Sequence, residues 1–178
     1  MVKVRSELPA YFKSLGFTKG AEIGVYKGEF TEMLCKEGLF VYAIDPWIAY
    51  SEQTRQERQD FLYGHTLRQL KKYPNCQVIK KTSMEAVKDF QDNSLDFVYL
   101  DGDHSFKAIA DDICEWEKKV RKGGIISGHD YQGQSAQYVP YVVDAYAKAY
   151  NRKVEVFGSR KLAVRRGDKQ GSWMWKKL

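Results

Sequence analysis

The chain has 178 residues, of which 43% are hydrophobic and 29% are charged, a composition typical of one globular domain with a sizeable core. Its longest apolar run, residues 39–44, is far shorter than the roughly 18 residues that indicate a membrane span, so we expect no membrane contact. The net charge of +6 comes from Lys and Arg pairs scattered along the chain, without a basic tail or a recognisable nucleic-acid module, which disfavours a nucleic-acid partner.

Helix and strand signals alternate regularly along the first half of the chain. Gly16, Gly38 and Pro74 stop the first three predicted helices. The second predicted strand is apolar, ends in an acid and is followed by Pro46. The elements predicted here are helix 6–15, strand 18–25, helix 28–37, strand 39–45, helix 52–73, strand 76–80 and helix 83–90.

The second half continues this alternation and then becomes rich in strands. The elements predicted here are strand 95–100, helix 106–120, strand 124–127, helix 139–150 and short strands over 154–157, 162–165 and 172–175. Strands that alternate with helices indicate a doubly wound, mostly parallel α/β sheet, and the strand-rich tail indicates an antiparallel C-terminal edge. No linker, repeat or low-complexity segment interrupts the chain, so we expect a single domain over 1–178.

The N-terminal sequence and the cysteines indicate the cellular compartment in which the protein is expected. Residues 1–7 include no apolar region of the kind found in a cleaved secretory signal. Cys35, Cys76 and Cys114 are odd in number and form no Cys-x-x-Cys pair, which favours buried, reduced thiols. We therefore expect a cytoplasmic protein.

Two predicted strands each lead directly into a cluster of carboxylates and imidazoles. The strand over 95–100 is followed by Asp101, Asp103 and His104, and the strand over 124–127 is followed by His129 and Asp130. The carboxyl ends of neighbouring parallel strands face one crevice, where such sheets hold ligands. These groups represent more polar chemistry than a packed core tolerates, so we expect a functional site at this rim.

The first strand supplies a second constellation, the turn Glu22-Ile23-Gly24-Val25-Tyr26-Lys27-Gly28. A glycine turn between a strand and a helix lets a ligand approach the backbone and the helix N-terminus. Asp45 ends the next strand about 20 residues later, where such folds place a carboxylate on ribose hydroxyls. Together these features indicate an adenosine-containing ligand.

Charge distinguishes between the adenosine cofactors. A dinucleotide would bring a pyrophosphate to this turn, where Tyr26 replaces the second glycine of its fingerprint and Glu22 stands nearby. A carboxylate about 4 Å from a phosphate would cost on the order of 4 kcal/mol at an effective dielectric of 20. The same carboxylate attracts the amino group and sulfonium of S-adenosylmethionine, so the sequence favours that methyl donor.

The motifs Glu22-x-Gly24-x-x-x-Gly28, Asp45, Leu100-Asp101-Gly102-Asp103-His104 and Gly128-His129-Asp130-Tyr131 resemble those of the class I S-adenosylmethionine-dependent methyltransferases. Within that family they are most similar to the small-molecule O-methyltransferases that act on macrolide sugars or catechols. The resemblance covers roughly residues 19–150. It implies a Rossmann-like seven-stranded sheet with an antiparallel last strand and helices on both faces, and methyl transfer to a hydroxyl group of a small molecule.

The resemblance also implies roles for individual residues. Asp45 would hold the ribose hydroxyls, Pro46 and Trp47 would lie beside the adenine, and Ser83 would meet the adenine edge. The other cofactor-binding residues would be Glu22, Gly24, Val25, Tyr26, Gly28 and Asp101.

A divalent metal and a base complete the implied site. Asp101 and Asp130, with His129, would be the metal ligands, although metal-dependent members often have a second carboxylate where His129 stands. Oxygen ligands favour Mg²⁺ or Ca²⁺, and an imidazole ligand shifts the preference toward Mn²⁺, Fe²⁺ or Zn²⁺. Asp103 or His104 would take the proton from the acceptor hydroxyl.

Each role has a structural alternative. Asp101 and Asp103 are also typical caps for a helix that begins near Ser105, and the histidines could be satisfied by local backbone. Asp45 could be an ordinary turn residue, and Trp47 could serve packing alone. Trp173 and Trp175 lie on one face of a strand, which more often fills a core than binds a ligand.

Other functions compatible with the sequence are an RNA or protein methyltransferase, a non-catalytic adenosyl-ligand-binding protein and an NAD-dependent oxidoreductase. The chain is short for the family it resembles, so a second copy in a homo-oligomer could complete the pocket for a small-molecule acceptor.

Overall fold

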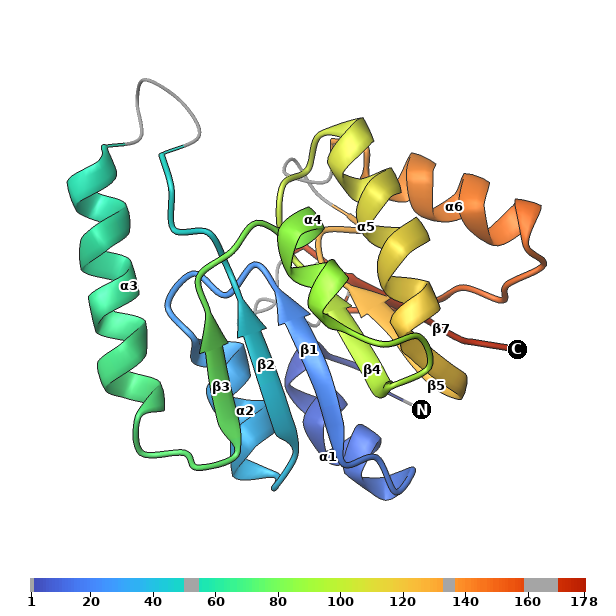
Figure 1. Cartoon of the computed structure of the whole chain (residues 1–178). Coiled ribbons are helices and arrows are strands. Elements are labelled where there is room, and N and C mark those ends of the chain that lie inside the picture. The colour runs from blue at the N-terminus through green and yellow to red at the C-terminus, as the bar shows by residue number, and fades with distance from the viewer. Residues whose placement is uncertain (1, 50–54, 133–136, 159–169) are drawn as a thin grey trace.

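The computed structural model describes residues 2–49, 55–132, 137–158 and 170–178. Within these residues the strands form one seven-stranded sheet in the order β3-β2-β1-β4-β5-β7-β6 (Figure 1). The strands are β1 (Lys19–Ile23), β2 (Phe40–Ile44), β3 (Cys76–Ile79), β4 (Leu95–Leu100), β5 (Val120–Gly128), β6 (Glu155–Phe157) and β7 (Ser172–Lys176). The first five run parallel, and β7 pairs antiparallel with both β5 and β6. The expected doubly wound sheet with an antiparallel C-terminal strand is confirmed.

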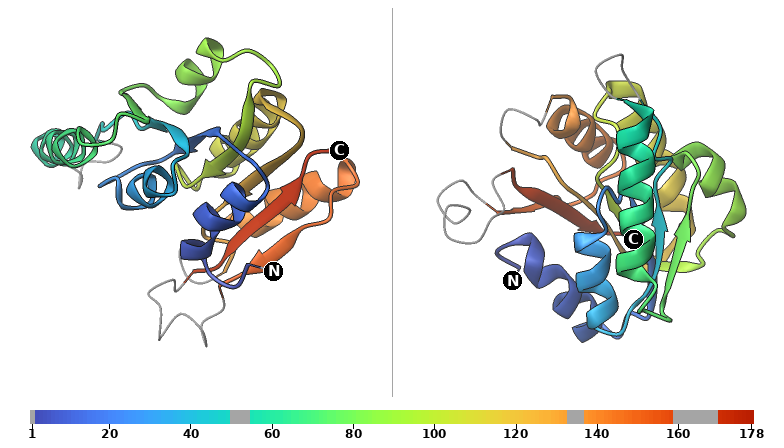
Figure 2. Two further views of the ribbon diagram at one scale, coloured as in Figure 1. Left: turned by 90° about the horizontal axis from the view of Figure 1, so that it is seen from below. Right: turned by 90° about the vertical axis from the view of Figure 1, so that its left-hand side faces the viewer.

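Helices cover both faces of the sheet (Figure 2). They are η1 (Arg5–Glu7), α1 (Leu8–Ser14), α2 (Glu29–Lys36), α3 (Gln56–Leu70), α4 (Ser83–Ala86), η2 (Val87–Asp89), α5 (Phe106–Lys119) and α6 (Val139–Ala149). Side chains of α1 and α2 share one apolar cluster, and those of α4, α5 and α6 share another on the opposite face. Helix α3 lies at the β3 edge of the sheet. No helix in the described ranges is long and apolar enough to cross a bilayer.

Large aromatic side chains fill both layers of the core. On the α4–α6 face, the rings of Trp173 and Trp175 stack with centroids 4.8 Å apart, and both side chains are buried. On the other face, Phe12 of α1 stacks on Phe97 of β4 at 4.5 Å. The two tryptophans therefore serve packing, as the core alternative predicted, because alternate residues of β7 point to one side of the sheet.

Two elements differ from the sequence-based expectation, and two further predicted segments cannot be compared. The strand predicted to begin at 124 begins at Val120, which pairs with Leu95, because a register shift between Leu95 and Phe97 accommodates the extra residues. The helix predicted over 83–90 is a single α-turn that continues as a 3₁₀ turn. The predicted strand 162–165 and the start of the predicted helix 52–73 lie outside the described residues.

The prediction for the cysteines is correct in part. All three thiols are free, and Cys35 is buried. Cys76 is only partly buried and Cys114 is exposed on α5, so burial does not hold for every thiol.

Asp96 joins three strands at the end of the sheet opposite the clusters. Its carboxylate accepts hydrogen bonds from the backbone N–H groups of Thr18 and Lys19, at 2.7 and 3.0 Å. It also pairs with the Arg121 guanidinium at 2.7 Å, at the register shift between β4 and β5. Burial opposes ionisation of Asp96, but these donors outweigh it and hold its pKa below the ordinary value of 3.8.

We predict that Asp96→Asn lowers the free energy of unfolding by about 1.5–3 kcal/mol at pH 7, because it removes a charge-assisted network. Since the pKa of Asp96 is lowered by folding, this contribution is complete above the unfolded-state pKa and disappears as the pH falls through the folded-state value. Urea unfolding at pH 7 and at progressively lower pH measures it. The exposed Asp92, paired with Lys119, supplies the control Asp92→Asn, for which we expect a much smaller change because solvent screens an exposed ion pair.

Candidate active site

Gly24 brings the β1–α2 turn against the loop that follows β4. Its φ of +86° is a conformation that glycine adopts freely. A Cβ at this position would lie 2.0 Å from the carbonyl oxygen of Asp101, so no other residue fits without moving the backbone. Gly28, with a φ of +81°, is the N-cap of α2. The glycine turn thus places the N-terminus of α2 beside the first acidic cluster.

Asp45 organises the same turn from the end of β2. One carboxylate oxygen accepts from the N–H groups of Val25 and Tyr26 at 2.9 and 3.0 Å, and the other accepts from Trp47 N–H at 2.8 Å. Asp45 therefore does stabilise the turn, as the alternative of an ordinary turn residue predicted. Oδ1, which accepts only from Trp47, still has acceptor capacity for a further donor such as a ribose hydroxyl.

Trp47 and its neighbour Pro46 lead the chain away from β2. The Trp47 side chain is buried, its indole N–H donates to the Tyr26 carbonyl at 3.0 Å, and its ring packs against Tyr63. These contacts favour the packing alternative for Trp47 over a place on the adenine. Pro46 is only partly buried.

Glu22 is a buried acid at the C-terminal end of β1, only 2% exposed. The Thr31 hydroxyl on α2 donates a hydrogen bond to it. Burial raises the pKa of Glu22 to about 8, although the Thr31 hydroxyl and the positive charge of Arg5 oppose the shift. Thr31 had no signal in the sequence, because its relation to Glu22 depends on how α2 packs on the sheet.

A cavity of about 300 Å³ opens over the carboxyl ends of β1, β4 and β5. Its lining residues are Arg5, Glu22, Gly24, Val25, Tyr26, Lys27, Glu29, Phe30, Asp101, His129, Asp130 and Gln170. The lining thus joins most of the predicted cofactor turn to the predicted metal ligands. Among these residues the acids outnumber the Lys and Arg side chains, so the cavity suits a ligand that carries positive charge.

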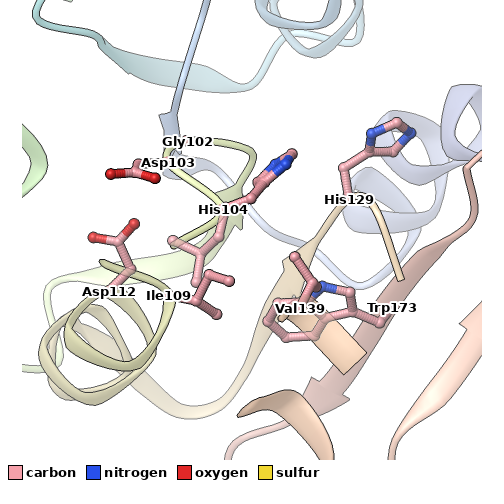
Figure 3. A pocket seen from close by; sticks show the side chains of 9 residues that line it. Gly102, Asp103, His104, Ile109, Asp112, His129, Val139 and Trp173 are labelled. Atoms are coloured by element: carbon pink, nitrogen blue, oxygen red, sulfur yellow. The ribbon is translucent and has the colours of Figure 1, made fainter. Parts of the chain in front are cut away.

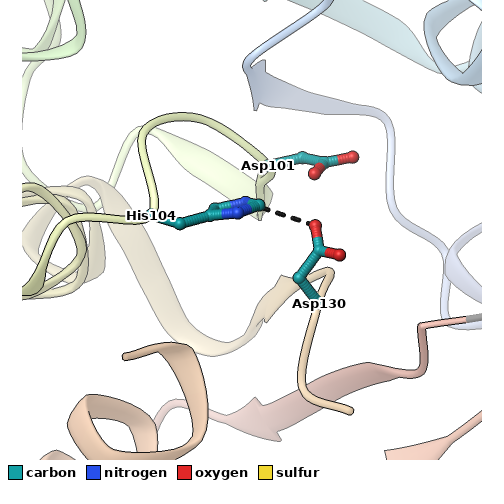
Figure 4. Close-up of side chains that lie close together, drawn as sticks. All are labelled: Asp101, His104 and Asp130. Carbon is teal, nitrogen blue, oxygen red and sulfur yellow. Dashed lines mark ion pairs between the residues drawn. The ribbon is translucent and has the colours of Figure 1, made fainter. Parts of the chain in front are cut away.

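Asp101, His104 and Asp130 come together beside this cavity (Figure 4). One potential ligand atom from each lies within 4.8 Å of the others. The Nε2 atom of His104 is 3.2 Å from a carboxylate oxygen of Asp130. The Nδ1 atom of His129 is 3.1 Å from the same oxygen and 3.7 Å from Asp101. His104, expected as a base, therefore lies among the potential ligands, and His129 lies beside them.

The pKa values of this cluster reflect burial and mutual contact. Burial raises the pKa of Asp101 to about 7, against the opposing charges of His129 and Arg5. The hydrogen bond with Asp130 raises the pKa of His104 above its ordinary value. Arg5, from the 3₁₀ turn near the N-terminus, pairs with Asp101 at 3.3 Å and lies over the Phe30 ring. The sequence carried no signal for this residue, because its contact depends on how the N-terminal segment folds back.

Asp103 and Ser83, two of the predicted site residues, do not point into the acidic cluster. Asp103 is exposed and points away from His104 (Figure 3), and its carboxylate accepts from the Ser105 backbone N–H at 2.8 Å. The N-cap of α5 is Ser105, whose hydroxyl accepts from the Ala108 N–H, so the capping alternative is wrong for Asp103. The Ser83 hydroxyl donates to Asp112 and accepts from the Trp116 indole N–H. Both residues lie outside the Asp101–His104–Asp130 cluster.

Comparison with known proteins gives one family. Residues 21–131 match the model of a family described as "Methyltransferase domain". A curated relative, an uncharacterised protein of Acanthamoeba polyphaga mimivirus, is 26% identical over 149 residues, which cover 77% of this chain and 65% of that protein.

Solved structures share the fold at low sequence identity. An O-methyltransferase of Bacillus cereus in complex with SAH has a TM-score of 0.69 and 15% identity, covering 97% of this chain and 80% of that one. An rRNA methylase of Streptococcus thermophilus has a TM-score of 0.68 and 15% identity, covering 100% and 99%. These likenesses concern the fold.

We predict that Asp101→Asn stabilises the metal-free protein at pH 8. An acid whose pKa rises on folding binds its proton more tightly in the folded state, so ionisation of Asp101 costs stability as the pH rises from about 3.8 through about 7. The gain in the variant should be largest at pH 8 and should shrink toward pH 4. Thermal unfolding in the presence of a chelator measures it, and a variant less stable than the wild type at pH 8 would contradict the prediction.

Proposed function

The chain belongs to this methyltransferase family and has the fold of the class I S-adenosylmethionine-dependent methyltransferases, and we propose its reaction on that basis. The protein transfers a methyl group from S-adenosylmethionine to a hydroxyl group of a small molecule, assisted by a divalent cation. The observation that carries the proposal is the cavity of about 300 Å³ that joins the glycine turn to Asp101 and Asp130. A methyl donor and a hydroxyl acceptor bound together in this cavity would have the methyl group and the hydroxyl close to each other.

The charge of the cavity supports the donor. Glu22 is buried at the end of β1, and the donor to it within the described part of the chain is the uncharged Thr31 hydroxyl. Burial of a carboxylate is costly unless an opposite charge or donor compensates it. The amino group and sulfonium of S-adenosylmethionine supply positive charge at this end of the site, whereas a pyrophosphate would add repulsion.

The donor set supports a divalent cation. Two carboxylates and an imidazole, from Asp101, Asp130 and His104, match the ligands of Mn²⁺, Fe²⁺ or Zn²⁺ better than the all-oxygen sets preferred by Mg²⁺ and Ca²⁺. His129 lies close enough to these carboxylates to take the place of His104. When bound, the cation would act as a Lewis acid toward the acceptor hydroxyl.

Proton removal falls to an imidazole in this proposal. Asp103 is turned toward the Ser105 N–H, whereas His104 and His129 both face Asp130. We therefore assign the proton to whichever of these two histidines does not ligate the cation. Methyl transfer is an in-line displacement that needs no covalent nucleophile, and alignment of the reactants can lower its barrier by about 7–11 kcal/mol.

A nucleic-acid acceptor finds less support. The acids that line the cavity, Glu22, Glu29, Asp101 and Asp130, would repel the phosphates of an RNA strand at the reaction site. The likeness to an rRNA methylase concerns the fold alone and gives no information about the acceptor. A small neutral or cationic molecule with a hydroxyl group fits this lining better.

We predict that S-adenosylmethionine binds with release of a proton at pH 7, and that NAD does not bind. Positive charge beside Glu22 lowers its pKa from about 8, so the acid ionises on binding. Calorimetry in buffers with different ionisation enthalpies measures the release. Glu22→Gln should remove most of it and weaken binding about tenfold or more. Binding of NAD alone would overturn the proposed donor.

We predict that Mn²⁺ binds the wild type and that Asp130→Asn weakens its affinity at least about tenfold, because the variant loses a charged ligand. Calorimetry with Mn²⁺ alone measures this in the absence of any acceptor. Asp103→Asn is the matched control, since it removes an equal charge from the neighbouring loop after β4 without touching the cluster. Equal Mn²⁺ affinity in both variants would contradict the assigned ligands, and methyl transfer indifferent to chelators would exclude the cation from the reaction.

A further inference from the structure

Two of the three free thiols lie next to each other, at the end of the sheet away from the cavity. Cys35 stands in the last turn of α2, and Cys76 is the first residue of β3. The cavity opens over the carboxyl ends of the parallel strands, so the start of β3 lies at the opposite end of the sheet (Figure 1). The two thiols are therefore separate from the candidate active site.

Asn75 anchors the end of α2 to the start of β3. Its side-chain amide donates to the carbonyl oxygens of Cys35 and Leu39, at 2.9 and 2.7 Å, and its own carbonyl oxygen lies 3.8 Å from Cys35 Sγ. Cys76 packs against the apolar cluster that contains Cys35, and the two thiols are in hydrogen-bonding contact with each other. Two sulfur atoms in contact on anchored backbones are the arrangement from which a disulfide forms.

The two thiols differ in access and in acidity. Cys35 is 4% exposed, whereas Cys76 is only partly buried and belongs to β3, at one edge of the sheet. The contact between the thiols lowers the pKa of Cys76 below its ordinary value of 9.0, and the same contact together with burial raises the pKa of Cys35. The thiolate is the nucleophile in disulfide exchange, so Cys76 reacts with an external disulfide before Cys35 does.

We propose that Cys35 and Cys76 form a reversible disulfide when the protein meets a small-molecule disulfide such as oxidised glutathione. In the sequence β2 and α3 lie between the two cysteines, so the bond closes a loop that contains both elements. A bond that closes a long loop stabilises a protein mainly by restricting its unfolded chain. Oxidation therefore raises the thermal stability of the protein and ties α2 covalently to the edge of the sheet.

One molecule of oxidised glutathione is consumed for each protein disulfide. The Cys76 thiolate attacks one sulfur of oxidised glutathione, so a mixed disulfide forms, the S–S bond of glutathione breaks and one glutathione thiolate leaves. The Cys35 thiol then gives up its proton and attacks Cys76 Sγ, so the protein disulfide forms and the second glutathione leaves. The two protein thiols lose two electrons and two protons in total, and these reduce oxidised glutathione to two molecules of glutathione.

The test compares wild-type protein incubated with oxidised glutathione and with reduced glutathione. Mass spectrometry of peptides from the unreduced, oxidised sample should find Cys35 linked to Cys76. The Tm of the oxidised sample should be higher by roughly 5–15 °C, and dithiothreitol should reverse both changes. Oxidised protein without this link, or linked protein with the Tm of the reduced sample, would overturn the inference.

Two variants separate the steps. Cys35→Ala should stop at the mixed disulfide of Cys76 with glutathione and should show no rise in Tm on oxidation. Cys114→Ala is the matched control and should keep the link and the full rise, because α5 packs on the face of the sheet opposite α2 and Cys114 is exposed there. Each comparison uses oxidised and reduced samples of one variant, so a lower basal stability of Cys35→Ala does not imitate the effect. A rise of equal size in Cys35→Ala, or a link to Cys114 in the wild type in place of the Cys35–Cys76 link, would contradict the inference.

Discussion

The contact between Gly24 and the Asp101 carbonyl is the constraint on which the site depends. A single side-chain carbon on Gly24 would lie 2.0 Å from that oxygen, so the glycine turn and the β4 loop are closer together than a residue with a side chain would allow. Hydrogen bonds from Gly24 N–H to Ile44 and from Asp101 N–H to Ile23 hold the adjoining strand ends in register. As a result, the turn that would hold the methyl donor and the acids that would hold the cation share one cavity.

Ionisation of the buried acids in the site costs free energy, and bound ligands can offset this cost. Burial raises the pKa values of Glu22, Asp101 and Asp112 to between about 7 and about 8. The ionised form of each acid is less stable in the site than it would be at the protein surface. Each of these acids lines a cavity. Perturbed acids gathered in a cleft are typical of functional sites. Positive charge from a donor or a metal would favour the ionised forms of Glu22 and Asp101, so ligand binding and proton release are linked.

The strands and the rim of the site could be predicted from the sequence, because apolar runs end directly in polar clusters and parallel strands align those ends. The order of strands then placed Asp101 beside Asp130. The directions of side chains beyond the strand ends could not be predicted. His104 turns toward Asp130 while its neighbour Asp103 turns toward Ser105, and this depends on the loop backbone. Arg5 reaches the site only because the N-terminal segment packs against α2.

Nuclear relaxation of a bound methyl donor measures whether the donor cavity and the cation cluster form one site. S-adenosylmethionine labelled with ¹³C at its methyl group would be bound to the protein and titrated with paramagnetic Mn²⁺. We predict strong Mn²⁺-induced relaxation of the methyl carbon in the wild type. A methyl signal that responds to Mn²⁺ no more than it does to diamagnetic Mg²⁺, while both ligands are bound, would contradict it.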